Sequence, residues 1–331
     1  MSTSANNKLS STLTAFIDNM DAGSWHTIPA ANRFDDVAFT RAEHDQSVAE
    51  TGSQAFFAGG PDRIVTNWNS AAYDSEDQTL YFHGGGHFAY GGNEVYAFDL
   101  TTLKWSRVTE PAPLTGPELT PANEYDNPAP SEGPYSRHTY DGLTWSPETD
   151  SMWLVSQSTG FVQRGNGVQP GGGGFWEFDP DTGEWTQHDV LDDAGDPVGS
   201  GFPTSAYNPE TGEIFVESKN YGSAATVTPN GDVVTHGGGG DTQRAGLGNM
   251  TFNPDDGLMY NLQHDGIYTL ERGTSGGLFN QRIAELPTEV SSRAGPDSGF
   301  AYDESENHFV IWGGKEEVWT FDPATNEFRA F

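Results

Sequence analysis

Residues 95–105 read VYAFDLTTLKW, and this stretch decides the fold because its pattern recurs twice along the chain. The recurrences are FWEFDPDTGEW at 175–185 and VWTFDPATNEF at 318–328. In each copy an aromatic residue stands directly before an Asp, and a second aromatic follows seven residues after the first. A strand, a tight turn rich in Asp, Pro, Thr and Gly, and a second strand explain this spacing. We therefore expect the two aromatics to pack between neighbouring sheets.

A second repeat lies upstream of these hairpins, and it consists of an extended run that closes on a turn and is followed by a short apolar strand. Its five copies are NSAAYDSED (69–77), DGLTWSPETD (141–150), TSAYNPETG (204–212), GNMTFNPDDG (248–257) and SGFAYDESEN (298–307). Each unit is expected to hold about four strands, as repeats of this length do in propellers. The predicted units span roughly 66–111, 136–191, 202–236, 245–287 and 295–331.

Five such units predict an all-β propeller of four-stranded blades over residues 24–331. Each sheet has two apolar faces and must lie between neighbours, so the ring has to close on itself. Residues 23–29 resemble a fourth strand, and residues 30–62 are expected to form either a partial sixth blade or a loop that closes the ring. Residues 112–135 are rich in Pro and acidic residues, which indicates a long insertion between blades 1 and 2.

The N-terminal segment, residues 1–23, is expected to contain one amphipathic helix. Apolar residues recur at roughly helical spacing over residues 8–20, and Gly23 can end the helix. This helix is predicted to cover part of the propeller or, alternatively, to dock on another structural protein. The segment lacks a basic stretch followed by an apolar core, so it does not resemble a signal peptide.

The charge of the chain excludes several classes of partner. Lys and Arg total 15 against 48 Asp and Glu, which leaves a formal net charge of -33. Such a surface repels nucleic acid and anionic membranes. No apolar run approaches the length of a transmembrane span, so membrane insertion is not expected. Cysteine is absent, which rules out disulfides, thiolate metal sites and a Cys nucleophile.

The repeats resemble those of kelch-type propellers, including the central domain of galactose oxidase. FHGGG at 82–86 and IWGGK at 311–315 stand where a kelch repeat carries its double glycine. Tyr96 or Trp176, with the later Trp105 or Trp185, stand where it carries its aromatic pair. The resemblance covers most of residues 60–331 and implies the propeller fold, whereas propellers host many activities. The copper chemistry of galactose oxidase needs a Tyr–Cys cross-link, which this chain cannot form.

The glycines after Phe82 do not indicate a nucleotide site. A phosphate-binding loop needs a helix whose N-terminus meets the phosphate, and here the expected continuation is a strand. We expect these glycines to turn the chain between the second and third strands of blade 1.

Polar residues are predicted to gather at one end of the ring. In propellers of this kind the loop between strands two and three lies at the same end as the start of strand one. By that rule the candidate ligand-binding residues are His83, Arg137, Arg164, Lys219, Asn220, Arg244, His264, Arg293, Lys315 and Trp68. They predict a locally basic patch that binds a hydroxyl-rich or anionic ligand, such as a glycan. Alternatively, the arginines tie the blades to acidic loops and the histidines fill turns.

The first functional hypothesis is a binding module that recognises a polysaccharide, a glycan or a protein partner, in an extracellular or virion-associated setting. The second is a lyase acting on acidic, uronate-containing polysaccharide. In that case His87 or His138 would be the base, Tyr90 or Tyr221 the acid, and Arg137, Arg164 or Lys219 would neutralise the carboxylate. No cofactor and no metal site are predicted, because the histidines lack the spacing of known zinc sites.

Overall fold

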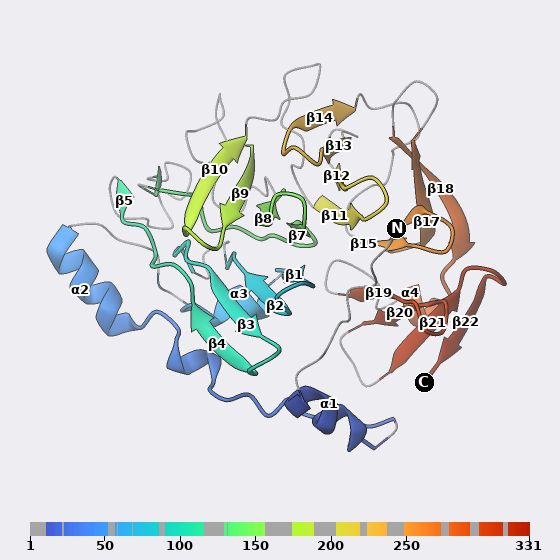
Figure 1. Cartoon of the computed structure of the whole chain (residues 1–331), viewed down its shortest axis with the longest axis horizontal. Coiled ribbons are helices and arrows are strands. Elements are labelled where there is room, and N and C mark those ends of the chain that lie inside the picture. Colours follow the sequence, from blue (N-terminus) through green and yellow to red (C-terminus); the bar gives the residue numbers. More distant parts are fainter. Residues whose placement is uncertain are drawn as a thin grey trace.

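The computed structural model describes residues 11–21, 23–51, 57, 59–67, 69–85, 90–115, 129–130, 132–155, 174–188, 203–218, 224–236, 248–272, 278–291, 298–313 and 317–331. Within them five antiparallel sheets of four strands follow one another, and in each sheet the strand order follows the chain order. The prediction of a β-propeller is therefore confirmed, with five blades (Figure 1).

The blades follow one another around the ring in chain order. Blade 1 consists of β1 (Ala72–Asp74), β2 (Thr79–Phe82), β3 (Tyr96–Asp99) and β4 (Lys104–Arg107). Blade 2 consists of β7 (Leu143–Ser146), β8 (Ser151–Leu154), β9 (Phe175–Asp179) and β10 (Glu184–His188). Blade 3 consists of β11 (Pro203–Asn208), β12 (Glu213–Ser218), β13 (Ala224–Val227) and β14 (Val233–His236). Blade 4 consists of β15 (Asn249–Asn253), β16 (Leu258–Gln263), β17 (Gly266–Arg272) and β18 (Leu278–Glu285), and blade 5 of β19 (Gly299–Asp303), β20 (His308–Trp312), β21 (Val318–Asp322) and β22 (Glu327–Ala330).

The turn after the first strand of a blade is held by the last residue of that strand. In blade 1 the Asp74 Oδ1 accepts the backbone N–H groups of Glu76 and Asp77 at 2.9 and 3.2 Å. Asn208, Asn253 and Asp303 accept backbone N–H groups in the same position of blades 3, 4 and 5. This local bond favours a turn over a continued strand, which explains why the repeat places Asp or Asn there.

The aromatic–Asp repeat forms the outer hairpin, as predicted. Asp99 accepts the N–H groups of Thr101 and Thr102, and Asp179 and Asp322 do the same in blades 2 and 5. The two aromatics of each copy are direct cross-strand partners. Their ring centroids lie 4.9 Å apart for Phe98 and Trp105, 4.9 Å for Phe178 and Trp185, and 4.8 Å for Phe321 and Phe328.

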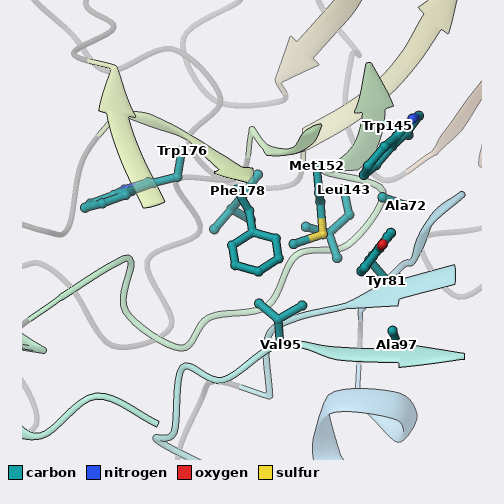
Figure 2. Packing of buried hydrophobic residues seen from close by; sticks show 10 residues of the cluster. Ala72, Tyr81, Val95, Ala97, Leu143, Trp145, Met152, Trp176 and Phe178 are labelled. Carbon is teal, nitrogen blue, oxygen red and sulfur yellow. The ribbon is translucent and has the colours of Figure 1, made fainter. Parts of the chain in front are cut away.

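The core is divided among the spaces between blades. Between blades 1 and 2, Tyr81 and Trp145 stack with centroids 5.3 Å apart, and Figure 2 shows their rings side by side. Val95, Met152 and Phe178 fill the same space and are fully buried. The inner strands of blades 1 to 5 also pack successively, β1 on β7, β7 on β11, β11 on β15 and β15 on β19.

Asp141 fastens three blades together near the axis of the ring. It precedes β7, forms an isolated parallel bridge with Thr204 of β11, and accepts the backbone N–H of Met250 of β15 at 2.8 Å. Burial raises the pKa of this carboxyl well above its usual range. The backbone N–H of Met250 offsets part of the cost of burying this carboxyl, which joins blades 2, 3 and 4.

The regular elements in the described N-terminal part of the chain are helices. It contains α1 (Ser11–Asp18), the 3-10 helix η1 (Phe34–Asp36), α2 (Arg41–Thr51) and α3 (Asp62–Thr66), and α1 lies within the helix expected at 8–20. The described part of 23–67 forms no strand, so neither the fourth strand considered at 23–29 nor the strands of a sixth blade are present there. A further strand is not needed here, because short apolar stretches of the N-terminal segment cover the aromatic face of blade 1 by packing alone.

The N-terminal segment covers the face of blade 1 that points away from blade 2, both with helices and with the chain between them. Leu13 packs on Phe98 and Leu103, and Phe39 packs on Tyr96. Trp25 of the same segment contacts blade 5 instead, and its ring centroid lies 5.6 Å from that of Trp312. Figure 1 shows α1 beside the space between blades 1 and 5. The N-terminal segment thus joins the two ends of the ring.

Two smaller features lie outside the blades and the N-terminal segment. The insertion contains a two-residue ladder of β5 (Leu114–Thr115) and β6 (Ala129–Pro130), and α4 (Thr288–Ser291) follows blade 4. Among the described residues no helix is both long enough and apolar enough to cross a bilayer.

Candidate functional site

The chain after β2 of blade 1 meets the chain before β7 of blade 2, as the topology rule predicts. Ser136 Oγ lies 2.8 Å from the carbonyl oxygens of both Gly84 and Tyr90. Gly84 has φ +136°, and a Cβ at that position would lie only 2.9 Å from the Arg137 carbonyl oxygen. The close approach of the two segments therefore requires glycine here. It brings His83, Tyr90 and Arg137 into one region.

His83, Arg137 and His138 are, however, buried rather than displayed. Their exposed fractions are 0%, 2% and 2%. Burial, reinforced by the nearby Arg137 charge, lowers the pKa of His83 to about 3. Burial also lowers the pKa of Arg137 to about 10, and its Nε donates to the Tyr135 carbonyl at 3.1 Å. A ligand-binding role for these three residues stays a prediction, and so does the alternative in which such residues hold blades and turns.

Tyr90 belongs to a buried acid cluster together with Glu94 and Tyr96. The Tyr90 and Tyr96 hydroxyls donate to Glu94 Oε1 at 2.5 and 2.9 Å, and the Tyr96 hydroxyl accepts the Phe39 N–H at 2.9 Å. Burial raises the pKa of Glu94 to about 7 and that of Tyr90 well above its usual range. Glu94 Oε2 has no hydrogen-bond partner among the described residues. The cluster connects blade 1 to the N-terminal segment.

The remaining predicted site residues divide into two groups. His264 lies in the exposed turn between β16 and β17. The other candidates lie outside the described residues, and these are His87, Tyr221, Arg164, Lys219, Asn220, Arg244, Arg293, Lys315 and Trp68. Their assignment to a shared ligand site, and the roles of His87, His138, Tyr90 and Tyr221 in a lyase, stay predictions. The described residues contain no group of His, Asp or Glu side chains suited to holding a metal ion.

A pocket lies at the base of the insertion, where blades 1 and 2 face each other, and we call it the insertion pocket. Asn93 builds one wall by clasping both ends of the insertion. Its Oδ1 accepts the Ala112 N–H at 2.8 Å, and its Nδ2 lies 2.8 Å from the Glu132 carbonyl and 3.1 Å from the Pro134 carbonyl. Asn93 is 6% exposed, so its amide is held in one place. One side chain thereby binds both ends of the long insertion.

Trp185 forms another part of the pocket wall. Its ring lies 4.9 Å from Phe178 and 5.1 Å from His83. Gly133 of the insertion crosses over the indole with φ +74°, and a Cβ there would lie 2.7 Å from Trp185 Cδ1. The half-buried indole is thus fixed on several sides, and it still lines the pocket.

The insertion pocket has a volume of about 630 Å³, within the usual range for small-molecule sites. Besides Trp185 and Asn93, its described lining includes Thr109, Glu110, Glu132 and Glu184. Arg107 stands behind it, with its Nε 3.1 Å from Glu110 and its Nη2 2.8 Å from Glu43 of α2. That hydrogen bond to Arg107 lowers the pKa of Glu43 to about 2. The pocket therefore offers an aromatic wall, neutral polar groups and several carboxylates.

Sequence reasoning did not identify this pocket. Trp185 was expected to be a packing residue of the aromatic pair, and it also serves that purpose. Asn93 follows two glycines and precedes a strand, and an isolated Asn at such a position does not indicate a binding site. The available signal was the insertion itself, because a long connection inside a compact domain is often functional.

No family model and no curated protein matches this chain. Among solved structures, it is similar to a streptogramin B lyase at 12% identity, over 84% of this chain and 72% of that chain, with a TM-score of 0.43. A virginiamycin B lyase from Staphylococcus aureus matches at 12% identity, over 79% of this chain and 68% of that chain, with a TM-score of 0.42. An auxiliary nutrient-binding protein from Bacteroides thetaiotaomicron matches at 12% identity, over 83% of this chain but 57% of that chain, with a TM-score of 0.48.

Likenesses this distant carry no argument about ligand or reaction, and the five-bladed architecture rests on the strand order described above. They add no support for the kelch resemblance, which stays a prediction.

Proposed function

We propose that this chain is a glycan-binding propeller and that the insertion pocket is its ligand site. The observation that carries the proposal is a cavity of about 630 Å³ that is lined by both an indole and several hydrogen-bonding groups. An indole offers a flat apolar surface to the C–H face of a sugar ring. Carboxylate, amide and hydroxyl oxygens can accept hydrogen bonds from sugar hydroxyls. The pocket thus matches both sides of a sugar.

Preorganisation supports this role. Trp185 is held by Phe178, His83 and Gly133, and Asn93 is held by three backbone groups of the insertion. Walls that are already fixed lose little conformational entropy when a ligand binds. A flexible polar surface of the same composition would bind more weakly for that reason.

The experiment compares two variants that add the same bulk at neighbouring residues. Thr182 lines the pocket and is exposed, whereas Asp181 is exposed on the same turn and does not line it. The Thr182→Tyr variant should lose binding on a glycan array and in calorimetry, and Asp181→Tyr should retain it. Equal binding by both variants, or no glycan bound by the unaltered protein, would contradict the proposal.

Uronate polymers are a poorer match for the insertion pocket, because its carboxylates would repel theirs. The lyase hypothesis can be tested on its own terms. If the protein releases unsaturated uronate products from such polymers, and the His138→Ala variant does not, then it is an enzyme. We expect no such release.

An extracellular or virion-associated setting would suit glycan binding, and cell or particle fractionation with an antibody to the protein would test it.

A further inference from the structure

The charges of the insertion pocket select among sugars. Its described lining includes the carboxylates of Glu110, Glu132 and Glu184 and no basic side chain. Glu110 is paired with Arg107 at 3.1 Å, but Arg107 is shared with Glu43. Glu132 and Glu184 are exposed, and no ion pair joins either of them to another described residue. The described lining of the pocket therefore carries negative charge that no basic side chain within that lining balances.

We propose that the insertion pocket binds an amino sugar, a glycan unit that carries a protonated primary amine. This inference rests on the proposed function and names the class of sugar that the same site takes. An ammonium group would bind to Glu132 and Glu184 by charge-assisted hydrogen bonds, which are stronger than those of a hydroxyl. The sugar ring would lie on Trp185, whose π face also attracts a nearby cation.

Alternative ligand classes fit the geometry less well. A neutral sugar would leave the carboxylates unbalanced, and a uronate would be repelled by them. A bare metal ion would make no use of the indole wall, and the described residues hold no cluster of ligands for one. A molecule that combines a flat apolar face with an ammonium group uses both features of the pocket.

The test uses three trisaccharides of similar size. These are the β-1,4-linked glucosamine trimer, its fully N-acetylated form, in which each amine is replaced by a neutral amide, and a galacturonate trimer. Binding constants come from calorimetry at physiological salt, where charges beyond about 8 Å are largely screened. The site is identified from the Trp185 indole N–H signal, assigned in the spectrum of the chain's nine tryptophans with the Trp185→Phe variant. The glucosamine trimer should bind about tenfold more tightly than the N-acetylated trimer.

Two double variants separate the pocket from the acidic surface. Glu132→Gln with Glu184→Gln removes two negative charges from the pocket, whereas Glu76→Gln with Asp181→Asn removes two from exposed positions outside it. All four positions are exposed, so both proteins should fold, which circular dichroism would verify. The preference for the amine should disappear in the first variant and persist in the second.

The outcomes are distinguishable. If the N-acetylated trimer shifts the Trp185 signal and binds as tightly as the amine, the amino-sugar inference is wrong and glycan binding stands. If the preference for the amine survives in the pocket variant, the amine binds to the acidic surface in general and the inference is again wrong. If none of the three sugars shifts the Trp185 signal, the proposed function fails as well.

Discussion

At the junction of blades 4 and 5, the Tyr302 hydroxyl of β19 donates to Asp255 in the turn of the preceding blade at 2.7 Å. At the same position of blade 3, Tyr207 donates to Glu148 of blade 2 at 2.6 Å. The equivalent residue of blade 1 is Tyr73, which is 39% exposed. Trp312, on the side of blade 5 that faces blade 1, is 41% exposed. Blades 3 and 5 thus each bind the preceding blade through this tyrosine. At the junction of blades 5 and 1, by contrast, the corresponding aromatic residues are partly exposed.

The two junctions also differ in what fills them. Between blades 4 and 5, Phe309 is completely buried among Tyr260, Phe300 and Phe321. Between blades 5 and 1 the filling comes from the N-terminal segment, which meets blade 1 through the Glu94 cluster and blade 5 through Trp25. The repeated junction is therefore filled by aromatic residues of the two blades themselves, whereas the N-terminal segment supplies both the apolar and the polar contacts that cover blade 1 at the closing junction.

The largest expected effect lies in the repeated junction. Phe309→Ala would leave a cavity among rings whose centroids lie 4.4 to 6.2 Å away. Such a truncation typically lowers the free energy of unfolding by about 3 to 5 kcal/mol. Denaturant unfolding would measure it, with Trp312→Ala as the matched aromatic truncation in the closing junction. A loss for Trp312→Ala as large as that for Phe309→Ala would remove the distinction between the junctions.

The next effect is the pH dependence of the closing junction. The pKa of Glu94 is raised from 4.5 to about 7, so the folded state holds a proton that the unfolded state releases. The protonated Glu94 therefore stabilises the folded state fully below pH 4.5. This stabilisation, roughly 3 kcal/mol, is lost as pH rises through about 7. Glu94→Gln has no proton to lose, so its stability relative to the unaltered protein should rise between pH 5 and pH 8.

Unfolding curves of both proteins at the two pH values give this difference, and the other titrating groups cancel in it. Protection of the Phe39 N–H in hydrogen exchange should weaken at the higher pH in the unaltered protein only, because that N–H binds to Tyr96 of the cluster. A constant stability difference across this range would show that Glu94 does not titrate there.

A smaller effect is expected from single hydroxyl groups. Tyr302→Phe removes the bond to Asp255 and should cost about 0.5 to 1.5 kcal/mol. Tyr207→Phe should cost a similar amount, since it removes the bond to Glu148. Tyr73→Phe, at the closing junction, should change the free energy of unfolding by less than about 0.5 kcal/mol. Three equal losses would indicate that Tyr73 makes the same kind of bridge in solution.

The smallest effect concerns the aromatic contact that joins the N-terminal segment to blade 5. Trp25 and Trp312 lie 5.6 Å apart with an interplanar angle of 44°, and Trp25 is 59% exposed. A double-mutant cycle of Trp25→Ala and Trp312→Ala should give a coupling of about 0.5 kcal/mol, at the low end for aromatic pairs. Additive losses would mean that the contact does not hold the segment.

Much of the fold was predictable because it depends on local chemistry. Asp99, Asp179 and Asp322 bind the N–H groups that follow them, and the aromatics at fixed spacing become cross-strand partners. The helices that cover blade 1 were only partly predictable. Residues 34–39 are too few to give a clear periodic signal, and their apolar side chains find partners only on the face of blade 1 that they cover.

The candidate site was less predictable than the fold. The meeting of His83 with Arg137 follows from propeller topology, but their burial does not follow from residue type. Glu94 reads as one more acid in a chain with 48 acidic residues, and its environment alone raises its pKa. Trp185 and Asn93 become pocket walls only when the insertion folds back across them.

The amino-acid sequence by itself determined the five repeating strand–turn units and the acidic surface, since these depend on composition and on nearby residues along the chain. Only the tertiary structure decided how the ring closes, which polar groups lose contact with water and where a cavity remains. Those outcomes depend on residues far apart in sequence, such as Asn93 with Glu132 and Trp25 with Trp312, whose approach is dictated by the packing of whole sheets.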